Sequence, residues 1–300
     1  MKMTLRDGYE EFILSRRLAD LSPKTIKDYQ QFLHPFLESV GLDKGVEEIT
    51  QGDITKYVAM LLDKPISKAT RATYIRHLKV LLKWLADNYS VAYNYKRVKV
   101  PKSPKKCVKI YSDEELTEIF KHIHCESEWL TVRNRCIIAL MYDSGLRQSE
   151  VCTLERSRIS FKEKRMVVHG KGNKERTVPL GGLTARLMRE YLDICPYKSN
   201  MLFVTRRGDP LTCNAVKLLV SKLSHSLTFE LSSHKLRHNF ATNYCIDQYE
   251  VRGHVDIYRL MILMGHEDIE TTKRYLHHAN EIVGARDSIS HLDKVYCLEN

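Results

Sequence analysis

Four short stretches in the second half of the chain combine basic, histidine and tyrosine residues that could bind and attack a phosphate. The first is SGLRQSEV (144–151), in which Gly145 is predicted to end one helix and Arg147 to begin the next. A guanidinium there adds donors to the positive end of a helix, which suits an oxyanion. Glu150 lies three residues on and could orient Arg147 or a neighbour. A simple surface Arg–Glu pair is the alternative interpretation.

The next two stretches contribute a lysine and a pair of histidines. Lys171 lies in the turn of a predicted β-hairpin, RMVVHGKGNKERTVPLG (165–181), where flanking glycines would let a ligand approach. In the stretch HKLRH, His234, Arg237 and His238 share one helix face. Histidines four residues apart could bind zinc. Because Arg237 on that face would repel a metal ion, phosphate binding fits better.

The last stretch, MGHEDIETTKRYLH (264–277), places His266 nine residues before Tyr275. A tyrosine hydroxyl can act as a nucleophile that forms a covalent intermediate. Any one of the sixteen tyrosines is more often a packing residue. Taken alone, therefore, this stretch does not identify a nucleophile.

Composition indicates a basic, water-soluble protein of two domains. The 300 residues carry a net charge of +11, which suggests a polyanion such as nucleic acid as partner. The longest apolar run, IIALMY, is far shorter than a membrane span, and the N-terminus shows no secretory signal. The eight cysteines include no C-x-x-C pair, which argues against zinc ribbons and disulfide scaffolds and suits a reducing cytosol.

A basic segment divides the chain. Residues 96–109, KRVKVPKSPKKCVK, contain seven cations and no acid. Pro101 and Pro104 forbid a continuous helix there. We expect an extended, positively charged segment that either contacts DNA or serves only as a linker.

Helical signals dominate on both sides of this segment. Before it, Ser22 with Pro23 starts one helix, Gly41 ends it, and Thr50 precedes another. Residues 67–88 have a single apolar face, formed by Ile75, Leu78, Leu82 and Leu85. After the segment, Ser112 and Glu115 form a capping box, a buried helix follows, and the hairpin interrupts further helices. The sequence therefore predicts a mainly α fold, with an all-helical first domain and a mostly helical second domain holding a small antiparallel sheet.

The order and spacing of the four stretches resemble the tyrosine recombinase (phage integrase-like) family, in particular its Xer-like branch. GLRQSE, GKGNKERTVPLG, HKLRHNFAT and LMGHEDIETTKRYLH carry the resemblance. It implies a helical DNA-binding domain at 1–98, a linker at 99–110 and a catalytic domain at 111–300 with a tail from about 277. Two departures stand out. The segment QYEVRGHV is expected to lengthen a loop, and twenty-five residues follow Tyr275.

The resemblance also implies a role for each site residue. Tyr275 would attack a DNA phosphorus and form a 3′-phosphotyrosyl bond, without ATP, metal or other cofactor. Arg147 and Arg237 would stabilise the charge on the phosphate oxygens. Lys171 would protonate the 5′-oxygen. The histidines His234 and His266 would bind the phosphate or handle the tyrosine proton, with Glu150 and His238 supporting the set.

Partners follow from the same resemblance. We expect double-stranded DNA with a specific recombination site, a tetramer assembled on it, and a place in the cytoplasm with the nucleoid rather than at a membrane. The tail, with a break at Gly284 and an apolar face of Ile289, Leu292, Val295 and Tyr296, could dock on a neighbouring copy or on its own chain. The cations predicted to contact DNA are Lys68, Arg71, Arg76, Lys79, Lys96, Arg97, Lys99, Lys102, Lys105, Lys106 and Lys174.

Three alternatives use some of the same residues. A type IB topoisomerase would share the chemistry without exchanging strands, and a DNA-binding factor could use the fold without catalysis. A metal-dependent nuclease would need clustered carboxylates. For a recombinase, the DNA site and the outcome, whether integration of a mobile element, excision, inversion or dimer resolution, stay open at this point.

Overall fold

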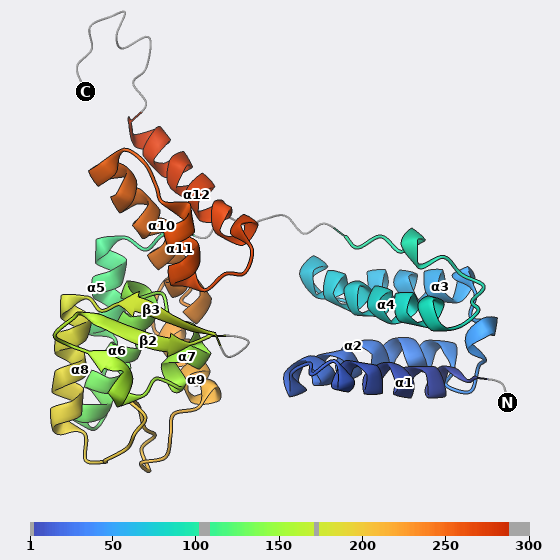
Figure 1. Ribbon diagram of the computed structural model, residues 1–300, viewed down its shortest axis with the longest axis horizontal. Coiled ribbons are helices and arrows are strands. Elements are labelled where there is room, and N and C mark those ends of the chain that lie inside the picture. The colour runs from blue at the N-terminus through green and yellow to red at the C-terminus, as the bar shows by residue number, and fades with distance from the viewer. Residues whose placement is uncertain (1–2, 102–108, 171–173, 288–300) are drawn as a thin grey trace, which may run out of the picture. The chain divides into compact units, whose positions relative to one another are not determined.

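Figure 1 shows the computed structural model, which describes residues 3–101, 109–170 and 174–287. The chain divides into two compact units, residues 1–106 and 107–300. The described residues form twelve α-helices and one three-stranded antiparallel sheet, so the predicted mainly α fold is confirmed. Within these ranges, no helix has the length and apolar character that crossing a membrane requires.

The described part of the N-terminal unit contains four α-helices, each of which begins after a capping side chain. The helices are α1 (Leu5–Leu18), α2 (Pro23–Val40), α3 (Gln51–Asp63) and α4 (Lys68–Asn88). The capping residues, whose hydroxyl oxygens accept a hydrogen bond from a backbone N–H of the first turn, are Thr4, Ser22, Thr50 and Ser67. Such caps pair donors that the start of a helix leaves free. The predicted starts after Ser22 and Thr50 and the predicted end at Gly41 are confirmed.

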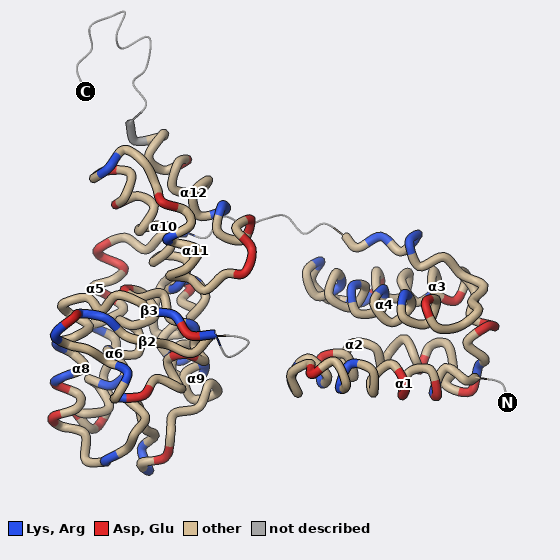
Figure 2. Tube along the Cα trace, viewed as in Figure 1, with Lys and Arg blue, Asp and Glu red and all other residues tan. Residues whose placement is uncertain are grey.

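The apolar faces of these helices bury a common core. On α4, Ile75, Leu78, Leu82 and Leu85 are each at most 1% exposed, as their spacing predicts. Lysines and arginines recur along α4 (Figure 2). Helix α4 therefore combines an apolar face that packs inward with cations on its other faces.

The basic segment at 96–109 is less extended at its start than predicted. Residues Tyr95–Arg97 form a short 3₁₀ helix, and the Val98 side chain is buried in the core of the N-terminal unit. Val100 also packs against that core. Because apolar residues alternate with the cations, burial holds this part of the segment on the N-terminal unit. Residues 102–108 lie outside the described residues.

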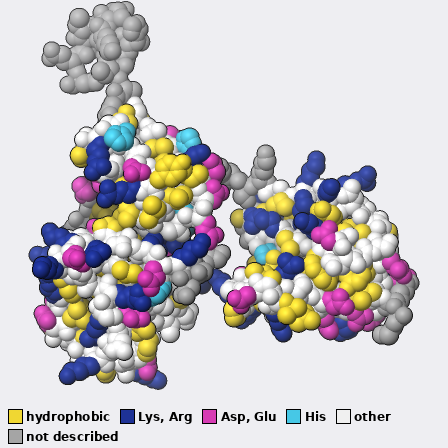
Figure 3. All heavy atoms as spheres, in the orientation of Figure 1, with side chains coloured by type: hydrophobic (Ala, Val, Ile, Leu, Met, Phe, Trp, Pro, Cys, Tyr) yellow, Lys and Arg dark blue, Asp and Glu magenta, His cyan; other side chains and the backbone are white. Residues whose placement is uncertain are grey.

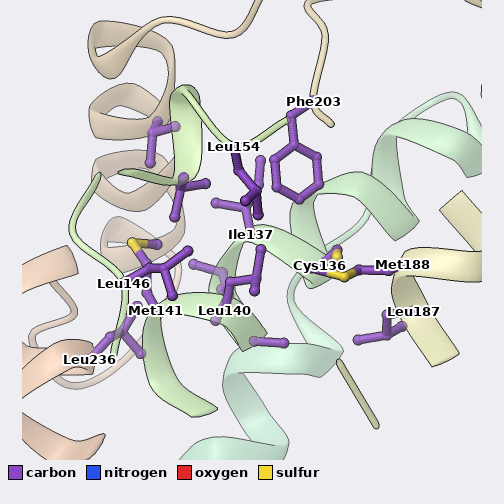
Figure 4. Close-up of a cluster of buried hydrophobic side chains, with 14 of the residues drawn as sticks. Cys136, Ile137, Leu140, Met141, Leu146, Leu154, Leu187, Met188, Phe203 and Leu236 are labelled. Atoms are coloured by element: carbon purple, nitrogen blue, oxygen red, sulfur yellow. The ribbon is translucent and has the colours of Figure 1, made fainter. Parts of the chain in front are cut away.

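The C-terminal unit is built around a buried helix, α6. Its first five helices are α5 (Asp113–Lys121), α6 (Glu128–Asp143), α7 (Gln148–Cys152), α8 (Gly182–Ile194) and α9 (Cys213–His225). Ile137, Leu140 and Met141 of α6 are fully buried within the cluster shown in Figure 4. The capping box of Ser112 and Glu115 at the start of α5 is present, as predicted.

The sheet has the order β1 (Ile159–Ser160), β2 (Arg165–His169) and β3 (Glu175–Pro179). Pairing of β2 with β3 confirms the predicted hairpin. Along β3 the residues alternate between exposed and buried, and Arg176 and Val178 point to the buried side. Residues 171–173, which include the predicted site lysine Lys171, lie outside the described residues.

Three further helices form a second small core. They are α10 (Ser233–Arg252), α11 (Ile257–Met264) and α12 (Ile269–Asp287). Phe240 of α10, Leu260 and Met264 of α11, and Tyr275 and Ala279 of α12 are buried together. These contacts fix the position of Tyr275 relative to helix α10.

Two sequence predictions about this region are wrong. The segment QYEVRGHV does not form a long loop, because residues 248–252 extend α10 until Gly253 ends it with a left-handed φ of 71°. Gly284 does not break α12, which continues to Asp287. Burial of Val283, which is 5% exposed, offsets the cost of a glycine within a helix. Residues 277–287 therefore belong to α12 rather than to a tail.

Candidate active site

The site begins at the sharp turn between α6 and α7. Gly145 has a φ of 61°, in the left-handed region that favours glycine. A Cβ atom at this position would lie 2.3 Å from a ring carbon of Phe240. Glycine is thus required by conformation and by space. The turn places Arg147 at the N-cap of α7, as predicted.

Arg147 is partly exposed, but the Glu150 carboxylate with which it pairs is buried. The Glu150 carboxylate accepts the backbone N–H of Arg147 at 2.7 Å and its Nη1 at 2.8 Å. Arg147 Nη2 donates to the carbonyl oxygen of Gly265 at 2.7 Å. The Glu150 side chain is only 1% exposed, so the surface-pair interpretation is wrong.

A second arginine, Arg176 on β3, shares the same carboxylate. Its Nη1 and Nη2 atoms donate to the two oxygens of Glu150 at 2.5 and 2.8 Å, and its Nε donates to the Leu263 carbonyl oxygen at 2.7 Å. The sequence analysis missed Arg176. An arginine at an inward-facing position of a strand was the available signal, because a buried charge needs a partner.

Arg237 approaches the same carboxylate at 3.9 Å and is almost completely buried. It donates hydrogen bonds to the carbonyl oxygens of Gly145 and Met264. Burial lowers the pKa of Arg237 to about 9, and the charge of Arg147 acts in the same direction. It stays charged at neutral pH.

Positive charge exceeds negative charge around Glu150. Burial opposes its ionisation, but the hydrogen bonds and charge of Arg176, with the hydrogen bonds of Arg147, hold the pKa of the carboxyl below its usual value. One carboxylate therefore serves three guanidinium groups, which are Arg147, Arg176 and Arg237. Such a cluster is suited to accept a further anion.

His234 and His238 lie one turn apart on α10 and contact each other. Their Nε2 atoms are 2.6 Å apart, which requires one ring to donate and the other to accept. Burial lowers the pKa of His238 to about 3, and the charge of His234 adds to the effect. Burial likewise lowers the pKa of His234, followed by the charges of Arg274 and Arg237. Neutral imidazoles are thereby favoured.

His266 follows Gly265, whose φ is 56°. Its Nδ1 lies 2.8 Å from the hydroxyl oxygen of Thr272, a fully buried residue of α12. Burial lowers the pKa of His266 to about 4, with the charge of Arg237 as the next cause. The sequence analysis also missed Thr272. Its contact with Nδ1 fixes the orientation of the His266 ring and leaves Nε2 free of this hydrogen bond.

Tyr275 is 3% exposed and lies between the histidines. Its ring centre is 5.0 Å from that of His238 and 6.0 Å from that of His266, with which it is stacked at 12°. Arg274, a third residue that sequence analysis missed, donates to its hydroxyl oxygen at 3.1 Å. The phenol is therefore placed among basic groups.

The predicted site residues that the structure describes meet in one place: Arg147, Glu150, His234, Arg237, His238, His266 and Tyr275. Lys171 lies outside the described residues. Lys174, close to it in the hairpin, is exposed and pairs with Glu267 at 3.2 Å. Across the described ranges, no group of three or more His, Cys, Asp or Glu residues could hold a metal ion.

The cations predicted to contact DNA from the N-terminal unit differ in their surroundings. Arg76 and Lys79 line a groove of about 500 Å³ together with Lys83 and Trp84. Arg71 instead donates to the carbonyl oxygens of Leu61 and Leu62 at the end of α3, so part of its role is structural. Lysine and arginine side chains protrude from the visible face of this unit (Figure 3). The other predicted cations described here are exposed: Lys68, Lys96, Arg97 and Lys99.

Comparison with known proteins agrees with this geometry. The model of the phage integrase family matches residues 110–281, and that of the phage integrase N-terminal SAM-like domain matches residues 9–90. The tyrosine recombinase XerC of Bacillus licheniformis is 28% identical over 274 residues, which cover 86% of this chain and 85% of the relative. The tyrosine recombinase XerC of Corynebacterium glutamicum is 26% identical and covers 87% of this chain and 83% of the relative.

Solved structures share the fold. The XerH recombinase in a post-cleavage complex with a palindromic difH substrate has a TM-score of 0.72 at 23% identity, covering 93% of this chain and 83% of that one. A lambda integrase dimer bound to a COC′ core site has a TM-score of 0.73 at 16% identity, covering 92% and 77%. Because the family model spans more than half of the sequence and includes every described residue of the site, the chain belongs to the phage integrase family.

Proposed function

We propose that this protein is a site-specific DNA recombinase that cuts and rejoins DNA through a 3′-phosphotyrosyl intermediate. One observation carries the proposal: a buried tyrosine lies among histidines that also adjoin a cluster of three arginines on one carboxylate. The cluster attracts a phosphate, and the tyrosine supplies an oxygen to attack it.

The arginines would bind the scissile phosphate. Arg147 and Arg237 now donate to backbone carbonyl oxygens, of Gly265 and of Gly145 and Met264 respectively. A phosphate oxygen forms a stronger, charge-assisted hydrogen bond than a neutral carbonyl does. The excess positive charge would then stabilise the pentacovalent transition state, which concentrates charge on the non-bridging oxygens.

In the cleavage step, the Tyr275 hydroxyl loses its proton to the neutral imidazole of His234 or His266. A bond forms between the tyrosine oxygen and phosphorus, and the bond from phosphorus to the 5′-oxygen breaks. Lys171, proposed from the sequence, gives that oxygen a proton. One phosphate ester replaces another, so rejoining needs no ATP, and no redox chemistry takes place.

The substrate we propose is double-stranded DNA with a specific recombination site. The related XerH structure contains a difH substrate, and the lambda integrase structure contains a core site. Residues 1–98 and the basic linker at 99–110 would contact the backbone, and residues 111–300 would carry the chemistry. We propose that the protein acts in the cytoplasm with the nucleoid and assembles as a tetramer on two sites.

The experiment that tests the chemistry is Tyr275→Phe, assayed on a nicked suicide substrate that traps the covalent adduct. Only the hydroxyl is removed, so DNA binding should persist while all adduct is lost. Tyr258→Phe, at an exposed tyrosine of α11, is the matched control and should form adduct normally. Cleavage should also continue in EDTA. Adduct from the Tyr275 variant, or a strict Mg²⁺ requirement, would contradict the proposal.

The linker's contribution is separable. Replacing Lys102, Lys105 and Lys106 together with Gln should weaken binding to specific and random DNA alike. The slope of log affinity against log salt should become shallower by at most about 0.9 for each phosphate that the linker no longer neutralises. Weaker binding at the specific site alone would mean that the linker reads bases.

A further inference from the structure

Helix α12 carries a cation at the nucleophile itself. Arg274 Nη2 lies 3.1 Å from the hydroxyl oxygen of Tyr275, and the guanidinium carbon lies 4.9 Å from the centre of the tyrosine ring. Arg274 thus donates to the atom that attacks phosphorus and covers the ring that bears it.

The helix does not impose this contact. Successive residues on an α-helix point about 100° apart, so neighbours in sequence do not normally face each other. An acidic partner for Arg274 stands one turn earlier, at Glu270. That carboxylate instead pairs with Lys273 at 2.5 Å. The Arg274 side chain folds back over Tyr275, where a cation and a phenol oxygen are brought together.

Arg274 differs in two ways from the other arginines of the site. Arg147 and Arg237 are anchored by Glu150 or by backbone carbonyl oxygens, and they lie on other elements. Arg274 is exposed and lies on the same helix as the nucleophile. Any displacement of α12 toward a phosphate would carry Arg274 and Tyr275 together.

We propose that Arg274 is a further catalytic residue, which stabilises the negative charge on the Tyr275 oxygen as the hydroxyl loses its proton. The inference rests on the proposed function. The proton passes to a neutral imidazole, the oxygen bonds to phosphorus, and the 5′-oxygen leaves with a proton from its acid. Arg274 remains charged and donates its hydrogen bond throughout, so it contributes charge stabilisation and no atom.

The groups around the Tyr275 phenol indicate which of them could stabilise negative charge on its oxygen. Among the described residues, the charged and titratable groups that face Tyr275 come from α10, from the turn before α12 and from α12 itself: Arg237, His238, His266 and Arg274. His234 contacts His238. The three imidazoles favour their neutral form, so the permanent charges that the described residues bring to the phenol are those of the two arginines. The charge of Arg274 is also among the causes, after burial, that lower the pKa of each imidazole. The same cation therefore lies at the phenol oxygen and favours the neutral imidazoles that would accept its proton.

The test compares Arg274→Gln and Arg274→Lys with Lys273→Gln. Lys273 is the matched control, because it is the preceding residue of α12 and its removal takes the same charge from the same turn. The rate of covalent adduct formation is measured on the nicked substrate at saturating protein, from about pH 6 to about pH 10. The upper limit is the pKa of an ordinary tyrosine, about 10.

Arg274→Gln should slow adduct formation by about 10²–10³-fold at neutral pH, the size of effect seen when one charge-stabilising donor is removed. The pH at which the rate levels off should move upward, because removing a hydrogen-bonded cation disfavours the charged phenol. Arg274→Lys should recover part of the rate, since an ammonium keeps the charge and one donor. Lys273→Gln should follow the parent profile.

A fluorinated tyrosine at position 275 gives an independent readout. Its phenol is more acidic and needs less stabilisation, so the rate ratio between the parent protein and the Arg274→Gln variant should shrink in that background. An unchanged ratio together with an unchanged pH profile would overturn the inference. A decrease in rate that parallels a loss of DNA affinity and a change in its salt dependence would also overturn it, because Arg274 would then be an ordinary phosphate contact. So would an Arg274→Gln variant whose rate does not decrease. The Tyr275→Phe assay separates the two levels: adduct there contradicts the proposed function, whereas a silent Arg274→Gln contradicts only this inference.

Discussion

The carboxylate of Glu150 and the guanidinium of Arg176 meet through two parallel hydrogen bonds, of 2.5 and 2.8 Å, with both side chains less than a tenth exposed. This pair joins strand β3 to helix α7. Arg176 also donates to the Leu263 carbonyl oxygen at the end of α11. The Arg176 side chain therefore holds strand β3 to helix α7 and to the end of helix α11, which directly precedes Gly265 and His266.

Breaking this pair should be costly. Glu150→Gln removes the carboxylate that Arg147 and Arg176 share, and Arg176→Gln takes two hydrogen bonds from the buried Glu150 carboxylate. Each should destabilise the C-terminal unit by about 3–5 kcal/mol. The double variant should cost less than the sum, because the interaction between Glu150 and Arg176 is then lost only once. The measurement is urea unfolding of the full chain carrying Trp84→Phe, so that Trp129, the remaining one of two tryptophans, reports on the C-terminal unit.

The control pair lies on the same hairpin. Arg165 and Glu163 are 2.8 Å apart, but both side chains are 53% exposed. Replacing either with Gln should leave stability close to that of the parent protein, since water screens an exposed pair. Equal effects at the buried and exposed pairs would contradict the argument.

The sequence was sufficient wherever structure depends on neighbours in the chain. The caps at Ser22, Thr50 and Ser112 and the apolar face of α4 involve residues at most a few turns apart, so local pattern determined them. The site residues on α10 were found for the same reason, because the spacing of His234, Arg237 and His238 in HKLRH places them on one helix face.

Contacts between segments that are distant in the sequence could not be predicted from local pattern. Arg176 is recognisable as part of the site only once β3 lies beside α7 and α11, which are 26 and 87 residues away in sequence. The continuation of α12 past Gly284 likewise depends on tertiary packing, here the burial of Val283. Propensity favoured a break, and burial outweighed it.

Two glycines of the site should tolerate no side chain. Gly145→Ala would be strained by its positive φ and would meet the Phe240 ring, so we expect a decrease of about 1–3 kcal/mol in stability. At Gly265, an added Cβ would lie 3.2 Å from side-chain atoms of Arg147 and Arg176. Gly265→Ala should therefore reduce the cleavage rate by at least about tenfold, as expected when a charge-stabilising donor is displaced.

Gly182 is the control, because a Cβ there meets no atom within 4 Å. Gly182→Ala, in the first turn of α8, should leave both stability and cleavage near the parent values. A neutral Gly145→Ala, by the same unfolding assay, would show that the turn between α6 and α7 relaxes more easily than its geometry indicates.

Acid should destabilise the C-terminal unit through its buried histidines. Burial lowers the pKa values of His238 and His266 to about 3 and about 4, whereas an unfolded histidine titrates near 6.5. Between those values the unfolded state binds protons that the folded state does not. Stability should therefore fall as pH drops below about 6.5, by up to roughly 1.4 kcal/mol per pH unit for each histidine.

The check is urea unfolding at a series of pH values, again read from Trp129. His238→Asn should reduce the slope of stability against pH. Substituting His254, an exposed residue beyond α10, with Gln should leave it unchanged. A flat profile in the parent protein would show that the folded state accepts these protons.

Lys171→Ala should slow cleavage by about 10²–10⁴-fold, because the 5′-oxygen would leave without its proton. Replacing that bridging oxygen with sulfur gives a leaving group that needs no proton, so the variant should recover most of its rate. Lys174→Ala is the control and should keep the parent protein's ratio of cleavage rates on the two substrates, because a DNA contact acts on both alike. If sulfur does not help the Lys171 variant, Lys171 is not the acid and Lys174 becomes the candidate.

The residues beyond α12 provide the last test. Residues 288–300 lie outside the described residues and contain Ile289, Leu292, Val295 and Tyr296, a spacing that predicts one apolar face of a short helix. A helix of this length is marginal in water by itself, so the face needs a surface to pack on. We propose that this surface belongs to a neighbouring copy on DNA, which would link assembly to placement of Tyr275.

Truncation after Asp287 removes these residues and leaves α12 whole. It should preserve stability and binding to a single site but abolish the complex of two sites, as measured by native gel shift and sedimentation. Truncation after Ala279 is the contrasting control, because it also removes the buried Val283 and should destabilise the C-terminal unit. If the protein ending at Asp287 unfolds more easily than the full chain, the segment packs on its own unit. If it still assembles normally on two sites, the segment has no role in assembly, and either result would contradict docking on a neighbour.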